Sequence, residues 1–336
     1  MGDLDAEIGF GWGGHRWNLE SRKTTKATSI GFRESGKCEK LTGVRARPLK
    51  SVNRFLAFGM NNYICVQCGT QFGETEQPPH SCSICEDERQ FVNWSGQQWT
   101  TLEQLQSDHS NRIEKEAEHL FGIGTEPSFA IGQRALLVQS PGGNLLWDCI
   151  TLVDDQTIAK VNALGGIRAI AISHPHFYSG MVEWSRAFSD APIYLHAADR
   201  EWVMRRDSCI QFWEETTRPL WDEMTLVHCG GHFEGGAVLH WPNGADGRGA
   251  LLTGDIIQVV QDRRYVSFMR SYPNLIPLSA ASVSRIVQRI EPLGFDRIYG
   301  AWWQRNVLSD GKSAVQRSAD RYLHAIGARS STVAQP

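Results

Sequence analysis

Three histidines and one aspartate stand at the ends of separate apolar runs, and these residue types bind transition metals. His174 and His176 belong to a His-Pro-His motif, His232 lies in Gly-His-Phe-Glu-Gly-Gly, and Asp255 ends Leu-Thr-Gly-Asp. Three neutral imidazoles leave a zinc ion one open position, where the pKa of a bound water can fall to about 7. The spacing therefore predicts one catalytic metal held by side chains from several strand ends.

Two residues in and beside these motifs also suggest catalytic groups. Asp255 can serve as a fourth ligand, or it can orient the attacking water and accept its proton. Tyr178 follows the His-Pro-His motif by two residues, where its hydroxyl could donate a hydrogen bond to a developing oxyanion. We therefore predict Asp255 and Tyr178 as catalytic residues, with His174, His176, His232 and Asp255 as metal ligands.

Two Cys-x-x-Cys pairs indicate a second, separate metal site. Cys65 and Cys68 form the first pair, Cys82 and Cys85 form the second, and 13 residues separate the two pairs. Each pair forms a turn that presents two thiolates, and two such turns complete a tetrahedral site, usually for zinc. The residues between the pairs include no Lys or Arg, which argues against phosphate contact. We predict a structural zinc, with iron for electron transfer as an alternative.

Length and composition restrict the class of protein. The chain has 336 residues, 41% of them hydrophobic and 21% charged, and a net charge of -3, as expected for a globular protein with a sizeable core. No run of about 18 apolar residues predicts a membrane span, and the first residues lack the apolar stretch of a secretory signal. We expect a cytoplasmic protein that acts on a small molecule and contacts neither nucleic acid nor membrane. The sequence leaves the oligomeric state open.

Charge and motifs divide the chain into four segments. Residues 1–59 hold 11 Lys and Arg against 6 Asp and Glu, a surplus of +5, and they show no apolar period, so we expect a basic, disordered extension. We expect the four-cysteine module at residues 60–95, a helical linker at 96–127 and the main domain at 128–336.

Beyond residue 128, short apolar runs alternate with turns and amphipathic segments, which predicts a layered α/β domain. We expect a hairpin of strands at 135–139 and 144–147, a helix at 155–164 and a buried strand at 167–173 that leads to His174. Further strands are expected at 193–196, 225–228, 237–241, 250–253 and 297–299, and further helices at 182–189 and 283–290.

Taken in order, these motifs resemble the metallo-β-lactamase superfamily over roughly residues 128–325. The landmarks are Leu-Trp-Asp at 146–148, the His-Pro-His motif, the glycine motif around His232 and Thr-Gly-Asp at 253–255. The resemblance implies a four-layer αβ/βα sandwich, with the three histidines as ligands of the first metal and Asp255 as the carboxylate that ordinarily bridges two metals. The four-cysteine module resembles the rubredoxin-like zinc ribbon that precedes this domain in some relatives.

The sequence departs from this family at the second metal. Where the family pattern continues His-x-His-x-Asp-His, this chain has Tyr178 and Ser179, and Gly-Ala-Trp at 300–302 replaces the usual Gly-His-Gly. Three second-site ligands are therefore absent together, and we expect a mononuclear site.

The resemblance implies a mononuclear zinc hydrolase that opens an ester, lactone, lactam or cyclic carbamate of a small molecule, for example in detoxification of foreign compounds. Two alternatives stay open. His174, His232 and Asp255 could form the two-histidine, one-carboxylate triad that binds iron(II) in oxygenases. The same fold could also serve binding without catalysis.

Overall fold

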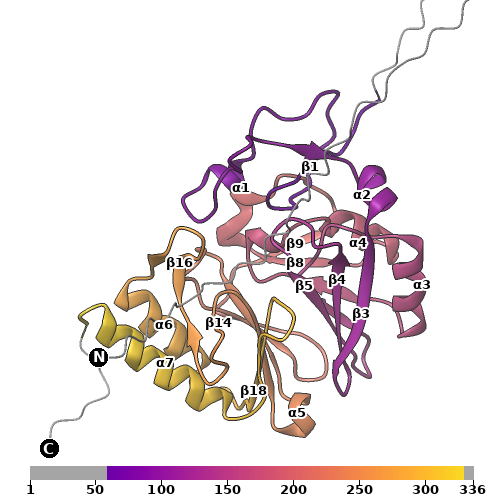
Figure 1. The fold of residues 1–336 in the computed structure, drawn as a ribbon. Coiled ribbons are helices and arrows are strands. Elements are labelled where there is room, and N and C mark those ends of the chain that lie inside the picture. Colours follow the sequence, from indigo (N-terminus) through magenta and orange to yellow (C-terminus); the bar gives the residue numbers. More distant parts are fainter. Residues whose placement is uncertain (1–58, 329–336) are drawn as a thin grey trace, which may run out of the picture. The chain divides into compact units, whose positions relative to one another are not determined.

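The computed structural model describes residues 59–328, all of which belong to one compact unit, Leu56–Pro336. The expected basic extension at 1–59 lies outside the described residues except for its last position. Two β-sheets and the helices that cover them make up most of this unit (Figure 1).

The first sheet has seven strands, and its spatial order follows the chain from β3 to β9. Neighbours are antiparallel from β3 to β6 and parallel from β6 to β9. Helices α3 and α4 connect the parallel strands and cover one face, where Val161 and Trp184 share a core with Leu146 and Ile170. The strands are β3 (Ser110–Ala117), β4 (Leu120–Glu126), β5 (Arg134–Val138), β6 (Leu145–Trp147), β7 (Ala169–Ala171), β8 (Ile193–His196) and β9 (Ile210–Trp213), and the helices are α3 (Asp155–Ala163) and α4 (Met181–Ala187).

The second sheet has six strands in the order β10-β11-β12-β13-β18-β19. Only the β13 and β18 pair is parallel, and the other neighbours are antiparallel. The strands are β10 (Thr217–Pro219), β11 (Thr225–His228), β12 (Ala237–Trp241), β13 (Ala250–Gly254), β18 (Arg297–Gly300) and β19 (Asn306–Val307). Short elements between them are α5 (Gly244–Gly247), β14 (Gln258–Val259), β15 (Val266–Ser267), β16 (Met269–Ser271) and β17 (Ile276–Pro277).

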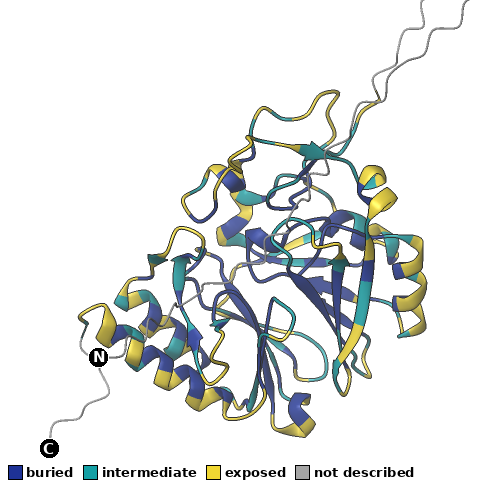
Figure 2. Cartoon of the chain, viewed as in Figure 1, coloured by how far each residue is buried: buried dark blue, intermediate teal, exposed yellow. Residues whose placement is uncertain are grey.

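The side chains of a strand alternate between the two faces of its sheet, and here both faces are buried. In β13, Leu251 packs beneath helices α6 (Ala280–Ile290) and α7 (Gly311–Ala325), whereas Leu252 packs between the two sheets. The central strands in Figure 2 are accordingly buried, whereas the edge strand β3 is partly exposed and α6 and α7 turn exposed residues outward. Two sheets between two helical layers form the expected four-layer sandwich.

The covering helix α6 shows why its sequence becomes a helix. Ser279 caps its start because the side-chain oxygen accepts a hydrogen bond of 3.2 Å from the amide of Ser282. Val283, Ile286 and Ile290 recur at helical spacing and are buried. Helix α7 is not among the expected elements, because several of its buried positions are Ala or Ser and give only a weak apolar period.

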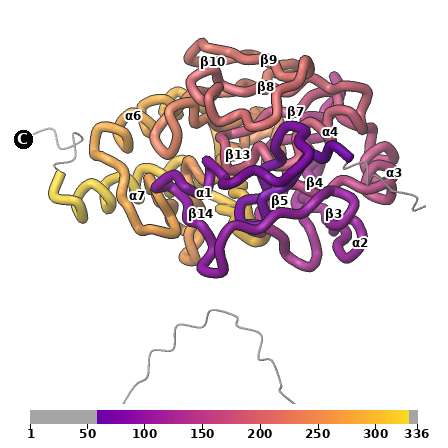
Figure 3. Tube along the Cα trace, turned by 90° about the horizontal axis from the view of Figure 1, so that it is seen from above, coloured from indigo at the N-terminus to yellow at the C-terminus, as the bar shows by residue number. Residues whose placement is uncertain are grey.

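The four-cysteine module contains β1 (Ile64–Cys65) and α1 (Ser83–Glu86), and β1 pairs with β2 (Trp99–Thr100), which lies just beyond the expected end of the module at residue 95. Its small core consists of the four cysteines and Ile84. Seen from above in Figure 3, it lies across the ends of both halves of the sandwich. Backbone hydrogen bonds connect it to the first half, as between the amide of Gln71 and the carbonyl oxygen of Ser179 (3.2 Å).

Within the helical linker predicted for 96–127, only Leu102–Asp108 is helical, and the rest of the prediction is wrong. Helix α2 (Leu102–Asp108) is capped by Thr101, and the chain then enters the edge strand β3 and its partner β4. An edge strand pairs on one side only and often carries charged residues, so the polar pattern of β3 imitates that of an exposed helix. The first sheet therefore begins at Ser110, well before the expected domain boundary at 128.

Candidate metal centre

The structure brings the four predicted ligands together from both sheets. His174 and His176 follow β7 through a 3-10 turn (Pro175–Phe177), His232 lies in the loop between β11 and β12, and Asp255 directly follows β13. One ligand atom from each of these side chains lies within 4.8 Å of the others. We name these four residues the histidine site.

The distances between these atoms fit the edges of a small coordination polyhedron. Nε2 of His174 lies 2.9 Å and Nε2 of His232 lies 3.8 Å from Oδ1 of Asp255. Nε2 of His232 lies 3.2 Å from Nδ1 of His176. Ligands about 2.0–2.1 Å from a tetrahedral zinc are separated by roughly 3.3 Å. The site therefore has the size that a zinc ion requires.

Unpartnered buried atoms also favour a cation at this position. The four side chains belong to residues that are 1% to 4% exposed. Although Nε2 of His174 and Oδ1 of Asp255 are 2.9 Å apart, neither atom has a hydrogen-bond partner. A buried carboxylate oxygen without a partner is costly, and a bound cation would satisfy both atoms. The donor set of three imidazoles and one carboxylate therefore fits a metal such as zinc or iron.

Hydrogen bonds on the far side of the rings orient two of the histidines. Nδ1 of His232 lies 2.9 Å from the carbonyl oxygen of Met269, which can only accept a hydrogen bond, so Nδ1 carries the ring proton and Nε2 the lone pair. Nδ1 of His174 lies 2.9 Å from the hydroxyl oxygen of Ser173. The amide of Ser173 in turn donates to Asp148, so that Asp148 supports His174 indirectly.

The electrostatics of the site favour neutral His176 and His232 beside an ionised carboxylate. Burial lowers the pKa of His232 to about 4, although Asp255 opposes this shift. Burial and the neighbouring histidines hold the pKa of His176 well below its usual range. Burial alone would raise the pKa of Asp255, but attraction to His174 and His232 outweighs it and keeps this pKa below its usual range. Neutral imidazoles and an ionised carboxylate are the forms that bind metals.

Core packing fills the places where the second-metal ligands of the family would stand. Tyr178 is buried in the same core as Phe177 and Ala301, and burial raises the pKa of its hydroxyl well above the usual value. The hydroxyl of Ser179 is 2.9 Å from the amide nitrogen of Gln133. The catalytic role of Tyr178 stays a prediction.

Trp302 packs against this core and donates from its indole nitrogen to the carbonyl oxygen of Ile131 (2.9 Å). Its neighbour Trp303 lies over the outer strands instead, where it contacts Gly122 and Gly124 of β4. The guanidinium of Arg112 lies 4.1 Å from the centre of the Trp303 ring. Trp303 therefore packs over the surface of the first sheet.

Several residues around the histidine site have no signal in the sequence. The ring of Phe233 packs against all three histidines, at centroid distances from 4.9 to 5.5 Å. Asp199 accepts a hydrogen bond of 2.7 Å from the amide of Gly235, in the His232 loop. Arg89, from the segment after the last ribbon cysteine, reaches the same loop. Asp199 and Arg89 are distant from His232 in sequence and belong to no motif.

The four-cysteine site is equally compact. Sγ of Cys65 lies 3.6 Å from Sγ of Cys85, and Sγ of Cys68 lies 3.6 Å from Sγ of Cys82. All four are buried free thiols, and sulfur ligands about 2.3 Å from a tetrahedral zinc are separated by roughly 3.8 Å. The side-chain amide of Gln97 also donates to Sγ of Cys65 (3.2 Å). The arrangement fits a four-cysteine metal site.

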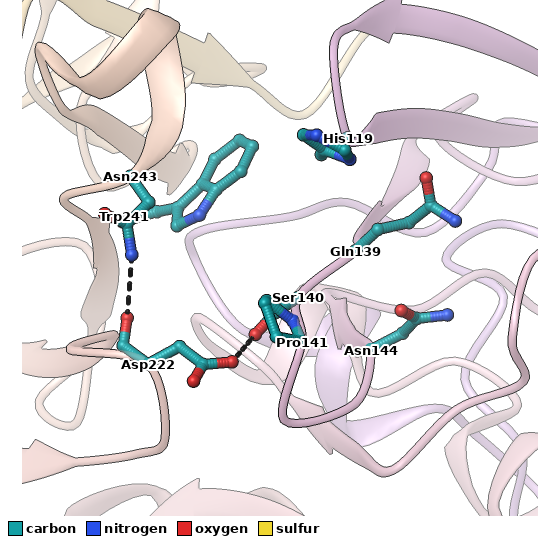
Figure 4. A pocket seen from close by; sticks show the side chains of 8 residues that line it. All are labelled: His119, Gln139, Ser140, Pro141, Asn144, Asp222, Trp241 and Asn243. Carbon is teal, nitrogen blue, oxygen red and sulfur yellow. Dashed lines mark hydrogen bonds between the residues drawn. The ribbon is translucent and has the colours of Figure 1, made fainter.

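A cavity of about 550 Å³ lies at the opposite ends of the strands (Figure 4). Asn144 precedes β6, which runs parallel to β7, whereas His174 follows β7. Asp222 is fixed there by Ser140 and by the amide of Gly142 (2.7 Å). The lining residues are His119, Gln139, Ser140, Pro141, Asn144, Asp222, Trp241 and Asn243. None of them is a candidate metal ligand.

The strand order, the four layers and the histidine site at the strand ends define a protein with the metallo-β-lactamase fold. The relative named "Uncharacterized protein YmaE" from Bacillus subtilis (strain 168) is 53% identical over 269 residues, which cover 80% of this chain and 97% of the relative. The chain belongs to the family of YmaE. No protein-family profile matches it.

Similar solved structures are metallo-β-lactamases. DIM-1 exposed to ceftazidime is 14% identical with a TM-score of 0.48, covering 64% of this chain and 98% of that chain. FIM-1 from Pseudomonas aeruginosa in the mono-zinc form is 15% identical with a TM-score of 0.47, covering 64% and 96%. Scores below 0.5 do not carry the assignment, which rests on strand order and the side-chain cluster. Among residues 59–328, every helix is too short or too polar to cross a membrane.

Proposed function

We propose that this protein is a metal-dependent hydrolase with one zinc in the histidine site. The observation that carries the proposal is the convergence of three imidazoles and one carboxylate, with Nε2 of His174 and Oδ1 of Asp255 left without hydrogen-bond partners. His174, His176, His232 and Asp255 would hold the ion. A second zinc would be structural and would be held by Cys65, Cys68, Cys82 and Cys85.

Zinc in such a site supplies a Lewis acid that lowers the pKa of water and polarises a carbonyl group. Asp255 stays ionised at neutral pH and can orient a water molecule by accepting its proton in a hydrogen bond. We assign Tyr178, which burial keeps protonated, as a hydrogen-bond donor to the oxyanion of the substrate. Burial of the site would exclude bulk water from these groups.

The substrate class we propose is a small molecule with an ester, lactone, lactam or cyclic carbamate bond. A single metal that polarises one carbonyl suits these groups. Reduced thiols in the four-cysteine site suit a cytoplasmic location. Neither a nucleic acid nor a membrane is part of the proposal.

The test is hydrolysis of a panel of chromogenic esters, lactones, lactams and cyclic carbamates by the zinc-loaded full chain. A His232→Ala variant should lose hydrolysis and one zinc ion. His240→Ala is the matched control, because this histidine lies on β12, is not one of the four ligands, and its side chain bonds the carbonyl oxygen of Gly294 (2.8 Å). Hydrolysis that survives in His232→Ala would contradict the proposal.

A second candidate, a non-catalytic metal-binding protein on the same fold, is favoured by the burial of all four ligands. Binding of a small anion to the cobalt-loaded site distinguishes the two candidates, because an open coordination position changes the visible spectrum when an anion occupies it. An unchanged spectrum would favour the non-catalytic candidate.

A further inference from the structure

We propose that Arg89 is a positioning residue for His232, and that through Arg89 the four-cysteine module sets the metal affinity of the histidine site. The proposal rests on the proposed function in one respect, because it requires the histidine site to bind a metal. It adds a role for the ribbon beyond its own folding.

Arg89 is 3% exposed and reaches from the ribbon into the His232 loop. Its guanidinium donates to the carbonyl oxygen of His232 itself (3.5 Å) and to the carboxylate of Glu234 (3.2 Å). The same group lies 3.8 Å from the centre of the Phe233 ring, which packs against the three histidines. One side chain of the ribbon thus contacts three consecutive residues of the loop.

A second residue, Asp199, also holds the His232 loop in place. Asp199 accepts a hydrogen bond from the amide of Gly235 at 2.7 Å. Between Asp199 and Arg89, the segment from 232 to 235 is fixed at both ends. Outer partners that fix a ligand in this way typically change metal affinity by about 10–100-fold when they are removed.

The ribbon also holds the carbonyl group that orients the ring of His232. Nδ1 of His232 bonds the backbone oxygen of Met269. The segment just after Met269 is connected to the ribbon, because the hydroxyl of Ser271 donates to the carbonyl oxygen of Arg89 (3.2 Å). The side-chain amide of Asn274 donates to the carbonyl oxygens of residues 88 and 90 (2.9 and 2.8 Å). The contact of Arg89 with the His232 loop and the position of the Met269 carbonyl group therefore both depend on residues 88–90.

Metal in the four-cysteine site would help to hold residues 88–90 in position. Cys85 lies in α1, which has only 4 residues, far too few for a stable isolated helix. Asp87 follows α1 directly and binds the guanidinium of Arg89 through both carboxylate oxygens (2.6 and 3.0 Å). A metal that holds Cys85 in place therefore also restricts Asp87, two residues later, and the two contacts from Asp87 hold the guanidinium of Arg89.

The experiment measures cobalt(II) affinity at both sites of the full chain by competition with a chelator. Thiolate ligands give intense near-ultraviolet absorption that imidazole ligands lack, so one titration reports the two sites separately. The variant is Arg89→Met, which keeps an unbranched side chain at this position and removes every side-chain donor as well as the guanidinium that lies over Phe233. Arg205→Met is the matched control, because buried Arg205 also connects the ribbon to the sandwich, through Gln71 and Glu183, but does not contact the His232 loop.

We expect Arg89→Met to weaken cobalt binding at the histidine site by about tenfold or more, with the cysteine site unchanged, and Arg205→Met to change it by less than about threefold. Arg89→Lys should recover part of the loss. Equal affinity of Arg89→Met and wild type at the histidine site would overturn the proposal. If wild type itself binds no cobalt at the histidine site, the result contradicts the proposed function as well as the role of Arg89.

A folding defect of Arg89→Met would be visible in its circular dichroism and would leave Asp87→Asn as the second variant. A neutral amide at this position cannot hold the guanidinium by two charged contacts, yet the substitution leaves Arg89 and its packing in place. The expected loss of affinity at the histidine site is smaller, about threefold. No loss in a folded Asp87→Asn variant, together with an unfolded Arg89→Met variant, would show that Arg89 is needed for folding and does not set metal affinity.

Discussion

Gly235 of the His232 loop packs closely against Asp199, and a methyl group at Gly235 should destabilise the protein measurably. A Cβ atom at Gly235 would lie 2.7 Å from Cγ of Asp199 and 2.8 Å from its Oδ2. Ordinary contacts of a Cβ are 3.4 Å or longer, so the carboxylate or the loop must move by several tenths of an ångström. Asp199 is 1% exposed and has little space to retreat.

We expect Gly235→Ala to lower the free energy of unfolding by about 2 kcal/mol, within the range for overpacking of a buried contact. Movement of Asp199 would also weaken its bond to the amide of residue 235, which is 2.7 Å in the native chain. The assay is urea unfolding of the metal-free protein, followed by cobalt titration of the histidine site. Gly294→Ala is the control, because no atom lies within 4 Å of its added Cβ, and it should stay within about 0.5 kcal/mol of wild type.

A double-mutant cycle tests whether contact with Asp199 causes the loss of stability in Gly235→Ala. If the added methyl group clashes with the carboxylate, Gly235→Ala should cost little in an Asp199→Ala background, since the two changes share one contact. Additive effects, or a Gly235→Ala variant as stable as Gly294→Ala, would refute this reasoning about the loop.

Four other perturbations have definite expected results. The Cys82→Ser, Cys85→Ser double variant should lose the zinc of the four-cysteine site and should also bind metal more weakly at the histidine site, measured as metal content after dialysis against a chelator. Full retention of metal at the histidine site would contradict the proposed coupling between the two sites. Tyr178→Phe should lower kcat with zinc content unchanged, and an unchanged kcat would exclude Tyr178 as oxyanion donor. Removal of zinc from wild type should lower Tm, because zinc at 100 times its Kd adds about 2.7 kcal/mol, whereas the His174→Ala, His232→Ala double variant should respond less. Burial raises the pKa of Asp148 to about 7, so the metal-free protein should lose stability as pH rises from about 4 to 7 and this buried carboxyl ionises. The Asp148→Asn variant keeps the acceptor for the amide of Ser173 and should lose less stability than wild type between pH 5 and pH 8, measured by urea unfolding. An equal loss in the two proteins would count against this role of Asp148.

The histidine site could be predicted because each ligand stands next to a strong local pattern. Buried strands with continuous apolar residues, such as β7 and β13, lead directly to His174 and Asp255. Strand ends of the two sheets meet at one edge, so local motifs far apart in sequence converge there.

The parts that could not be predicted depend on tertiary contacts without a local signal. Arg89 and His232 are 143 positions apart, and a single arginine in a polar segment resembles any solvated arginine. The polar pattern of β3 predicts a helix because an edge strand carries charges on its open side. The sequence of α7 predicts no helix because Ala314, Ser318 and Ala319 are small buried residues with little apolar contrast.

The most direct test is the metal content of the purified full chain, for wild type and for the His174→Ala, His232→Ala double variant with all four ribbon cysteines intact. Two zinc ions per chain in wild type and one in the variant are the predicted result. One zinc and one iron in wild type, with the iron lost in the variant, would replace hydrolysis with oxygen chemistry at the same residues. One zinc in both proteins would contradict a metal site at His174, His176, His232 and Asp255.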